Sequence, residues 1–253
     1  MSRRTALIIC LALLIMLAVL TVCLILNPPP AEPAPPESAA QALPAEDAPE
    51  PAVETPEPTP SLPPPPDIDI DGWEFLYAGL NNGVGRYHPP VANFEMQYLD
   101  KRMLDYANDF LAAAREQGYE VYVGVAYRNF EYNMYRFENA IRDYGSSYEA
   151  AKHVFPPGTS EHSTGLAFDI TDEMDYSANY YEMHDETVAD TEVYKWMAEH
   201  CQEYGFIVRY PEGKEEFYGR ACYPGHFRYV GVEAATYIME NDLCLEEFLA
   251  LYE

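Results

Sequence analysis

The stretch "SEHSTGLAFDI", residues 160–170, predicts a turn that leads into a short strand. Gly165 has no Cβ, so the chain can turn sharply there. The residues after it are hydrophobic enough for a buried strand. In such a strand Ala167 and Asp169 face the same side. We therefore expect His162, from the loop, and Asp169, from the strand, to point into one site.

The stretch "CYPGHFRYVG", residues 222–231, supplies a third candidate for that site. His226 lies in an alternating, strand-like run, and Arg228 follows on the same face. Two imidazoles and one carboxylate make a three-ligand zinc site with an open fourth position. The spacing of His162 and Asp169 is weak evidence by itself, because most such pairs are structural or solvated.

The rest of residues 67–253 combines amphipathic helical segments with short strand-like runs. This pattern predicts an α+β domain, in which helices pack around one small, mostly antiparallel sheet. Thr191 is expected to cap a helix, and Gly118 and Gly145 to end helices. One helical face is predicted to carry Leu99, Met103, Ala107, Phe110, Leu111 and Ala114. Helices are expected over residues 97–118, 129–145, 146–154, 191–206, 232–242 and 245–253, and strands over residues 119–127, 166–170, 206–211 and 226–231.

The N-terminus has two arginines followed by an uncharged, apolar run over residues 6–26. At about 1.5 Å per residue this run would span roughly 30 Å, the thickness of a bilayer's hydrocarbon core. We predict that residues 1–27 form a single-pass membrane anchor, with the C-terminal domain outside the cytoplasm. Two alternatives remain open, a cleaved signal peptide and a lipoprotein signal that ends at Cys23.

Residues 28–66 contain 16 prolines and seven acidic residues, with no Lys or Arg. Such a composition cannot bury a core and favours an extended, self-repelling chain. We predict a disordered linker that holds the domain of residues 67–253 away from the membrane. A cell wall is one place where that distance matters.

The chain is acidic, with 42 Asp and Glu against 15 Lys and Arg and a formal net charge of −27. This charge argues against a nucleic-acid partner. We expect a monomer. Cys201, Cys222 and Cys244 allow at most one disulfide within the domain, and the sequence does not decide the pairing.

Taken together, the motifs resemble those of the LAS metallopeptidases, the group that includes the VanY-type D-alanyl-D-alanine carboxypeptidases. "SEHSTGLAFDI" matches their S-x-H-x-x-G-x-A-x-D pattern, and "PGHFRYVG" resembles their second motif. "VGVAYRN" is similar to the Tyr-Arg strand end that precedes both, and "YGFIVRYPEGKEE" to the stretch before the second motif. The resemblance covers most of residues 73–240 and implies an α+β fold around one zinc ion.

By position, the resemblance implies that the Zn²⁺ ligands are His162, Asp169 and His226. It also implies a catalytic role for Arg128, because a planar guanidinium can grip a carboxylate or stabilise a developing oxyanion.

Three further residues are expected around the substrate. Ser160 would hydrogen-bond the substrate's terminus, and Tyr127 would line the site. Arg228 is expected in the substrate-binding region, where it would order the site more than act on the substrate.

The second motif departs from the family pattern at the residue that should accept a proton. The family places a glutamate three residues before the second histidine, and there it takes the proton of the attacking water. Here that position is Tyr223, and the tryptophan often found next to the histidine is Gly225. A tyrosine has a pKa of about 10, so Tyr223 would be a poor base that can still donate a hydrogen bond. Tyr223 is nevertheless the candidate at the catalytic position.

Several explanations of this departure stay open. Another acid could serve, from Glu215 and Glu216 or from Asp172 and Glu173, whereas Glu161 is expected to point away from the metal. The metal and Arg128 could instead suffice for a slow enzyme. Cys222 could ligate the metal and close the site, which would make the zinc structural.

We therefore expect a zinc-dependent carboxypeptidase that removes a terminal D-alanine from peptidoglycan stem peptides. The alternative is a catalytically impaired domain that binds cell-wall peptides without cleaving them. The sequence does not choose between D,D- and L,D-specificity.

Overall fold

The computed structural model describes residues 62–171, 186–220 and 222–253. The predicted anchor and most of the predicted linker lie outside these residues, as do Asp172 and Glu173. The described part belongs to the unit formed by residues Thr59–Glu253. Its strands are β1 (Val91–Phe94), β2 (Gln97–Asp100), β3 (Tyr122–Val125), β4 (Ala167–Thr171), β5 (Phe206–Tyr210) and β6 (Tyr223–Tyr229). Its α-helices are α2 (Leu104–Glu116), α3 (Phe130–Tyr144), α4 (Ser147–Ala151), α5 (Glu192–His200), α6 (Glu215–Tyr218), α7 (Val232–Glu240) and α8 (Leu245–Ala250).

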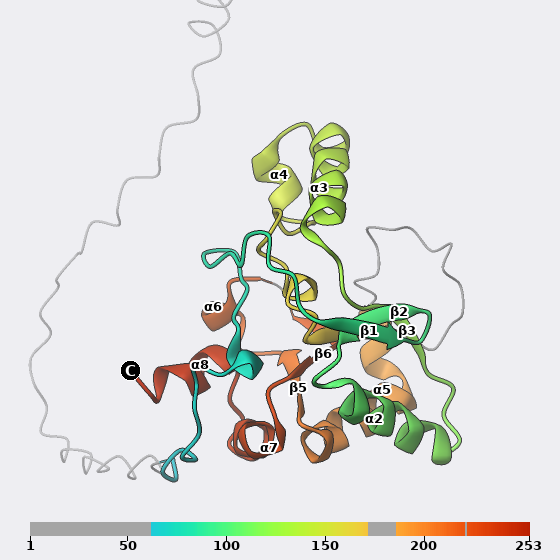
Figure 1. Cartoon of the computed structure of the whole chain (residues 1–253), viewed down its shortest axis with the longest axis vertical. Coiled ribbons are helices and arrows are strands. Elements are labelled where there is room, and N and C mark those ends of the chain that lie inside the picture. Colours follow the sequence, from blue (N-terminus) through green and yellow to red (C-terminus); the bar gives the residue numbers. More distant parts are fainter. Residues whose placement is uncertain (1–61, 172–185, 221) are drawn as a thin grey trace, which may run out of the picture. The chain divides into compact units, whose positions relative to one another are not determined.

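A four-stranded antiparallel sheet in the order β3-β4-β6-β5 forms the centre of the unit. Figure 1 shows helices around this sheet, with α3 and α4 at one end of the unit and α2 and α5 at the other. The predicted α+β class, with helices around a small antiparallel sheet, is therefore confirmed.

Strand alternation separates a hydrophobic face of the sheet from a polar one. On β4 the side chains of Phe168 and Ile170 enter the main core, and Asp169 between them faces the other way. On β6 Phe227 enters the same core, and its neighbour His226 takes the polar face. The candidate ligands therefore lie on a rigid surface whose reverse side is well packed.

The helices complete two hydrophobic clusters. Phe110 of α2 stacks against Phe206 of β5 at 5.4 Å between ring centroids, and Met197 of α5 joins the same core. Ala235 of α7 and Phe248 of α8 form a second cluster on Ile207 of β5. All these side chains are buried.

One predicted helix begins later than expected. Residues 97–100 form β2, which pairs with β1 in a tight hairpin, and the helix starts only at Leu104. The two turn residues, Glu95 and Met96, have φ values of 49° and 63°, as a two-residue hairpin turn requires. The spacing of Leu99 and Met103 fits one helical face, but the two residues belong to different elements. Leu99 lies in β2 and Met103 directly precedes α2, and both side chains are buried.

The helix start predicted at Thr191 and the helix end predicted at Gly145 agree with the structure. Thr191 accepts a hydrogen bond from the backbone N–H of Tyr194 and caps α5. Gly145 has a φ of 81° and ends α3 in the left-handed conformation. Cys201 and Cys244 are buried and form no disulfide.

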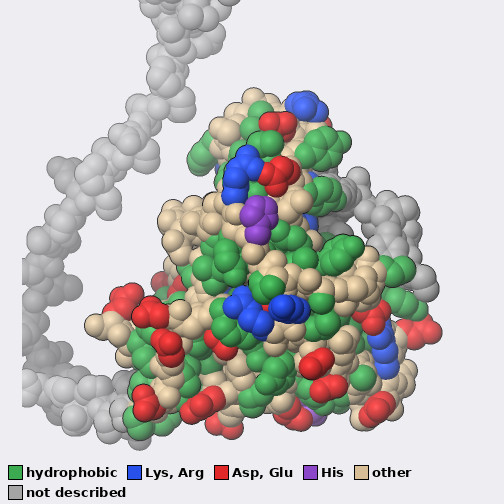
Figure 2. All heavy atoms as spheres, viewed as in Figure 1, with side chains coloured by type: hydrophobic (Ala, Val, Ile, Leu, Met, Phe, Trp, Pro, Cys, Tyr) green, Lys and Arg blue, Asp and Glu red, His purple; other side chains and the backbone are tan. Residues whose placement is uncertain are grey.

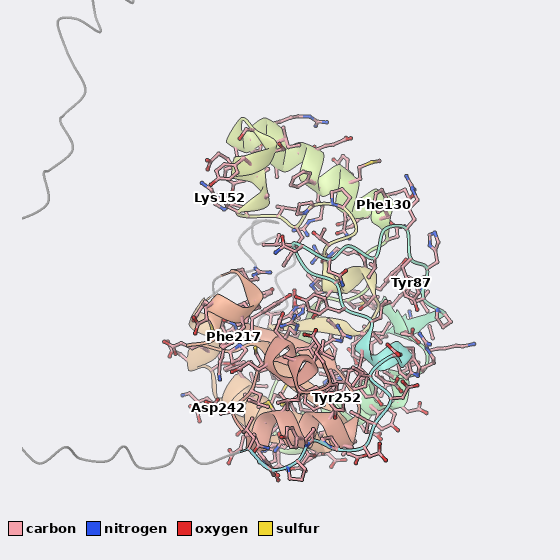
Figure 3. All side chains as sticks on the ribbon, turned by 90° about the vertical axis from the view of Figure 1, so that its left-hand side faces the viewer. Tyr87, Phe130, Lys152, Phe217, Asp242 and Tyr252 are labelled. Carbon is pink, nitrogen blue, oxygen red and sulfur yellow. The ribbon has the colours of Figure 1, made fainter. Side chains whose placement is uncertain are left out.

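The last prolines of the predicted linker contact the C-terminal helices. Tyr237 donates a hydrogen bond to the Pro63 carbonyl at 2.6 Å, and Tyr252 donates one to the Pro66 carbonyl at 2.7 Å. Figure 3 labels Tyr252 beside the last helix. Ile68 and Ile70, just after the prolines, pack against the α7–α8 cluster.

Two features of the described residues are the charges on the surface and the length of the apolar helices. Figure 2 shows one face of the unit, on which acidic side chains spread over the lower part and Lys and Arg gather in small groups among hydrophobic residues. Within residues 62–171, 186–220 and 222–253, no helix is long and apolar enough to cross a bilayer. The predicted membrane span lies outside this range and stays a prediction.

Candidate metal centre and active site

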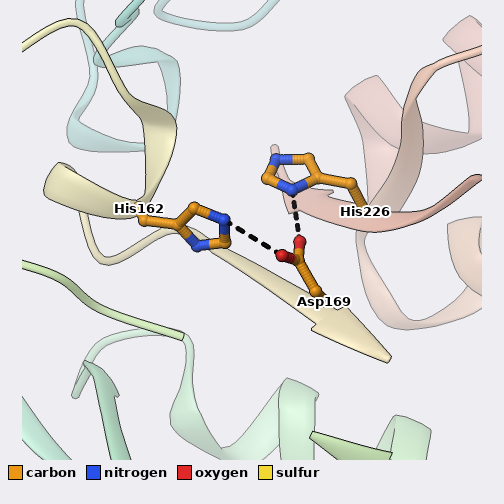
Figure 4. A group of neighbouring side chains, drawn as sticks. All are labelled: His162, Asp169 and His226. Carbon is orange, nitrogen blue, oxygen red and sulfur yellow. Dashed lines mark hydrogen bonds and ion pairs between the residues drawn. The ribbon is translucent and has the colours of Figure 1, made fainter. Parts of the chain in front are cut away.

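The three predicted ligands lie together on the polar side of the sheet. Asp169 is central, with its Oδ1 at 2.6 Å from Nδ1 of His226 and its Oδ2 at 3.3 Å from Nε2 of His162 (Figure 4). The two imidazole rings stand nearly perpendicular, with centroids 4.9 Å apart. One ligand atom from each residue lies within 4.8 Å of the others.

Local structure explains this convergence. Asp169 and His226 are direct cross-strand partners on β4 and β6. His162 comes from the short 3₁₀ helix Glu161–Ser163, and Gly165, with a φ of 75°, turns the chain from that helix into β4. A Cβ at Gly165 would meet the backbone nitrogen of Asp100 at 3.2 Å, so the predicted sharp turn also needs a residue without a side chain.

The electrostatics favour an ionised Asp169 between the histidines. Burial raises the pKa of the Asp169 carboxyl, but the charges and hydrogen bonds of His162 and His226 outweigh it and hold this pKa well below its usual range. Burial lowers the pKa of His226, but attraction to Asp169 outweighs it and the net pKa is raised. For His162 burial prevails and its pKa is lowered.

This donor set fits a zinc ion. One carboxylate and two imidazoles are common zinc ligands, and three ligands leave a fourth position open for catalysis. The ring nitrogens that face Asp169 are Nε2 of His162 and Nδ1 of His226, so these two atoms are the ones available to the ion. Within those residues the group that could hold a metal contains His162, Asp169 and His226 and does not include Cys222. A closed, structural site completed by Cys222 therefore finds no support.

Tyr223 supports a metal ligand from the position where the family pattern has glutamate. Its hydroxyl donates a 2.8 Å hydrogen bond to Oδ2 of Asp169. Burial, and next the Asp169 charge, raise the pKa of Tyr223 well above its ordinary value, so it is a donor and a poor base. Gly225, with a φ of 80°, interrupts the regular alternation of β6 between Tyr223 and His226. Both side chains can therefore reach Asp169.

Glu161 lies beside His226, contrary to the expectation that it would point away. The expectation assumed an extended chain, but Glu161 begins a 3₁₀ turn and is only 1% exposed. Its Oε2 is 3.5 Å from Nε2 of His226. Burial raises the Glu161 pKa, but the charges of Arg209 and Arg228 outweigh it and lower the pKa well below the usual range. Glu161 is thus an ionised acceptor and a weak base.

Arg228 belongs to the support of the site and not to its substrate-facing surface. It is fully buried, and its Nη1 donates to Oε1 of Glu161 at 3.1 Å. Its Nη2 donates to the carbonyls of Glu74 and Leu76, and its Nε to the carbonyl of Tyr229. These contacts place Arg228 beneath Glu161, and its role toward a substrate stays a prediction.

Arg128, Tyr127 and Ser160 border the cluster. The Arg128 backbone N–H donates to the His162 carbonyl at 3.0 Å, and its side-chain Nε is buried without a partner in the described residues. Ser160 is buried and directly precedes the 3₁₀ turn that carries His162. Tyr127 is half-buried, and burial raises its pKa. Their roles toward a substrate stay predictions.

Sequence reasoning missed two residues of α3. Asn133 is buried, and its side-chain nitrogen donates to Oγ of Ser163 at 2.8 Å, which ties α3 to the His162 turn. Arg136 follows on the same helix face, and its charge adds to burial in lowering the pKa of His162. Asn133 and Arg136 are three residues apart, so they share one face of the helix that follows the Tyr-Arg strand end. This spacing in the sequence could have indicated that both face the site.

The other candidate bases do not reach the cluster in the described residues. Glu215 is half-buried and Glu216 exposed on α6, and neither pairs with a ligand. The carboxylates at ion-pair distance from the ligand histidines are Asp169 and Glu161.

The sheet, the His-Asp-His cluster and the turn that carries His162 define a LAS-type metallopeptidase fold, and comparison with known proteins gives the family. The model of the VanY family, D-alanyl-D-alanine carboxypeptidase, matches residues 96–232, and the chain belongs to this family.

Relatives and solved structures agree with this assignment. A D-alanyl-D-alanine carboxypeptidase of Enterococcus faecalis is 35% identical over 182 residues, which cover 66% of this chain and 64% of the relative. The structure of VanYB in complex with D-alanine-D-alanine has a TM-score of 0.60 at 32% identity and covers 72% of this chain and 100% of that chain. A mutant of the vancomycin-resistance D,D-pentapeptidase VanY in complex with Zn(II) has a TM-score of 0.59 at 32% identity and covers 70% and 99%. The chain spans 54% and 64% of the length of the first two curated relatives that it matches.

Proposed function

We propose that this protein is a zinc-dependent carboxypeptidase that removes a terminal D-alanine from peptidoglycan stem peptides. The observation that carries the proposal is the buried cluster of His162, Asp169 and His226, built on the sheet of a VanY-family domain. Similar proteins have been solved with Zn(II) and with D-alanine-D-alanine, which supports both the metal and the substrate class.

Each residue has a role that follows from its chemistry. His162, Asp169 and His226 would hold a zinc ion, which would supply polarisation of the scissile carbonyl and a lower pKa for water. The Arg128 guanidinium stabilises the negative charge that develops on the carbonyl oxygen. Ser160 hydrogen-bonds the terminal carboxylate of the peptide, and Tyr127 lines the site. Tyr223 holds Asp169 through the hydrogen bond already described.

Proton transfer is the weak point of this site. Glu161 is tied to two arginines and has a lowered pKa, whereas Tyr223 has a raised one, so neither is suited to accept a proton at neutral pH. A general base contributes about 100- to 10,000-fold to a rate. We therefore propose a slow peptidase compared with relatives that keep the glutamate.

Mass spectrometry of muropeptides tests the proposal. Tetrapeptide and pentapeptide muropeptides are incubated with purified residues 62–253 and zinc, with His226→Ala as the control. Loss of one alanine mass that is absent in the control supports the peptidase, and the peptide that shortens distinguishes D,D- from L,D-specificity. Intact peptides in both samples would refute it.

Tyr223 also favours a second candidate function, a domain that binds wall peptides without cleaving them. Isothermal titration with the same peptides would identify it. Saturable binding by zinc-loaded protein, with no alanine released after prolonged incubation, is the expected result for a binder.

The place of action proposed here is the outer face of the cell membrane. A single-pass anchor in residues 1–27 and the proline-rich linker would let the domain reach the wall. Membrane fractionation of cells that produce the full chain or a chain starting at residue 28 tests this. Equal recovery of both forms in the soluble fraction would contradict it.

A further inference from the structure

Two buried polar atoms beside the metal centre face each other without closer partners. Nε2 of His226 and Oε2 of Glu161 have no closer hydrogen-bond partner among the described residues. The distance between them is 3.5 Å. A buried donor or acceptor left unpaired costs about 1–3 kcal/mol, so such atoms are normally paired. The simplest pairing has a proton on Nε2 that points at Oε2.

The other side of the Glu161 carboxylate is fixed. Oε1 accepts from Nε of Arg209 at 2.7 Å and from Nη1 of Arg228 at 3.1 Å. Both arginines are buried. The carboxylate thus uses one oxygen for the arginines and leaves the other for His226.

A second carboxylate holds the arginine in turn. Glu246 of α8 accepts from Nη1 and Nη2 of Arg209 at 3.0 and 2.6 Å, and Tyr77 donates to it at 2.9 Å. This chain of contacts runs from the C-terminal helix through Arg209 to Glu161 and ends at a metal ligand. The side chains of Arg209 and Glu161 each make several hydrogen bonds, which restricts the conformations that they can adopt.

We propose that Glu161 is a positioning residue that fixes the tautomer and orientation of His226. With the proton kept on Nε2 by Glu161, the lone pair of Nδ1, the atom that faces Asp169, is available to a metal. The inference rests on the proposed metal centre and deepens it. Partners of this kind on a ligand histidine typically contribute about 10- to 100-fold to metal affinity.

The variant Glu161→Gln tests whether Glu161 orients His226 or only neutralises the charges of Arg209 and Arg228. Glutamine has one oxygen and one amide nitrogen, and two arginine donors favour the oxygen on their side. The amide N–H₂ then faces Nε2 of His226, where it favours a lone pair and moves the ring proton to Nδ1. Glu246→Gln is the matched control, because it removes a carboxylate from the same Arg209 without touching His226.

Zinc affinity is measured by competition with a chromophoric chelator on the zinc-free full chain, with no peptide present. We expect Glu161→Gln to weaken zinc binding about 10- to 100-fold and Glu246→Gln to change it less than about threefold. Equal affinities in all three proteins, or equal losses in both variants, would show that Glu161 only balances the arginine charges and would overturn the proposal.

Nitrogen NMR of ¹⁵N-histidine protein gives a readout that needs no variant. In the zinc-loaded protein, His226 should carry its proton on Nε2, and a proton on Nδ1 would refute the inference even if Glu161→Gln does not fold. A wild type that binds zinc no better than His226→Ala would refute the metal centre itself. If the protein bound zinc tightly and showed the expected tautomer but cleaved no peptide, the proposed activity would be refuted and this inference would stand.

Discussion

At the scale of single residues, the site differs from its family pattern in where negative charge is placed. Tyr223 occupies the position of the expected base, and its hydroxyl donates a hydrogen bond to Asp169. Tyr223 therefore holds a candidate metal ligand in place and adds no negative charge. Glu161 supplies a carboxylate to His226 but is neutralised by two arginines. Positioning is well provided for in this arrangement, and proton transfer is not.

Tyr223→Glu should restore the missing base. We expect kcat for alanine release to rise by about 100-fold or more, the lower range of what a general base contributes. Tyr223→Gln is the matched control, with the same size and no proton-accepting carboxylate. If the glutamate variant released alanine no faster than the glutamine variant, the missing base would not limit the proposed activity.

The stability of the zinc-free domain should show the Asp169–His226 pair through its pH dependence. The folded-state pKa of Asp169 is lowered, so its contribution is present above about pH 4 and is lost as the pH falls. The folded-state pKa of His226 is raised, so its contribution is complete below about pH 6.5 and is lost as the pH rises. Urea unfolding of wild type and Asp169→Asn from pH 3 to 9 should therefore differ most between about pH 4 and 6.5. A difference that is constant over this range would contradict the pairing.

At the scale of secondary-structure elements, β6 depends on one glycine. Gly225 has a left-handed φ of 80°, and a Cβ there would lie 3.1 Å from Cγ1 of Val188. Gly213 has a nearly equal φ of 81° but open space around it. The tryptophan often found beside the histidine in the family would meet both obstacles in this backbone.

We expect Gly225→Ala to lower the free energy of unfolding by more than Gly213→Ala. Backbone strain alone costs about 1–2 kcal/mol for a left-handed alanine, and only Gly225 adds crowding. Urea denaturation of Gly225→Ala measures strain and crowding together. Urea denaturation of Gly213→Ala measures the strain alone. Equal losses would mean that Val188 yields and that β6 tolerates a side chain at this position.

At the scale of the whole described unit, the segment before the first strand is part of the fold. Ile68 and Ile70 pack on the α7–α8 cluster, and tyrosines bind the carbonyls of Pro63 and Pro66. Removing residues 62–71 should lower the free energy of unfolding by about 1–3 kcal/mol, since each isoleucine is only partly buried. Thermal unfolding measures the loss, and zinc affinity should not change. A shortened chain with unaltered stability would show that these contacts are marginal.

The sequence by itself determined the elements and the ligand types. Hydrophobic spacing, helix caps and Gly165 predicted most helices and strands, because these signals act over a few residues. The resemblance of the two histidine motifs placed three ligands that the fold then brought within 4.8 Å. Local signals failed for Leu99, where helical and strand spacing cannot be told apart in a short run.

Only the tertiary structure decided how the buried charges pair. Glu161, Arg209, Arg228 and Glu246 lie far apart along the chain and pair in the fold, with β5, β6, α8 and the His162 turn each contributing one. Because residues 161–163 form a 3₁₀ turn and not an extended chain, Glu161 faces His226 and does not point away. Such pairings depend on distances across the fold, because a buried charge is stable only where an opposite charge meets it.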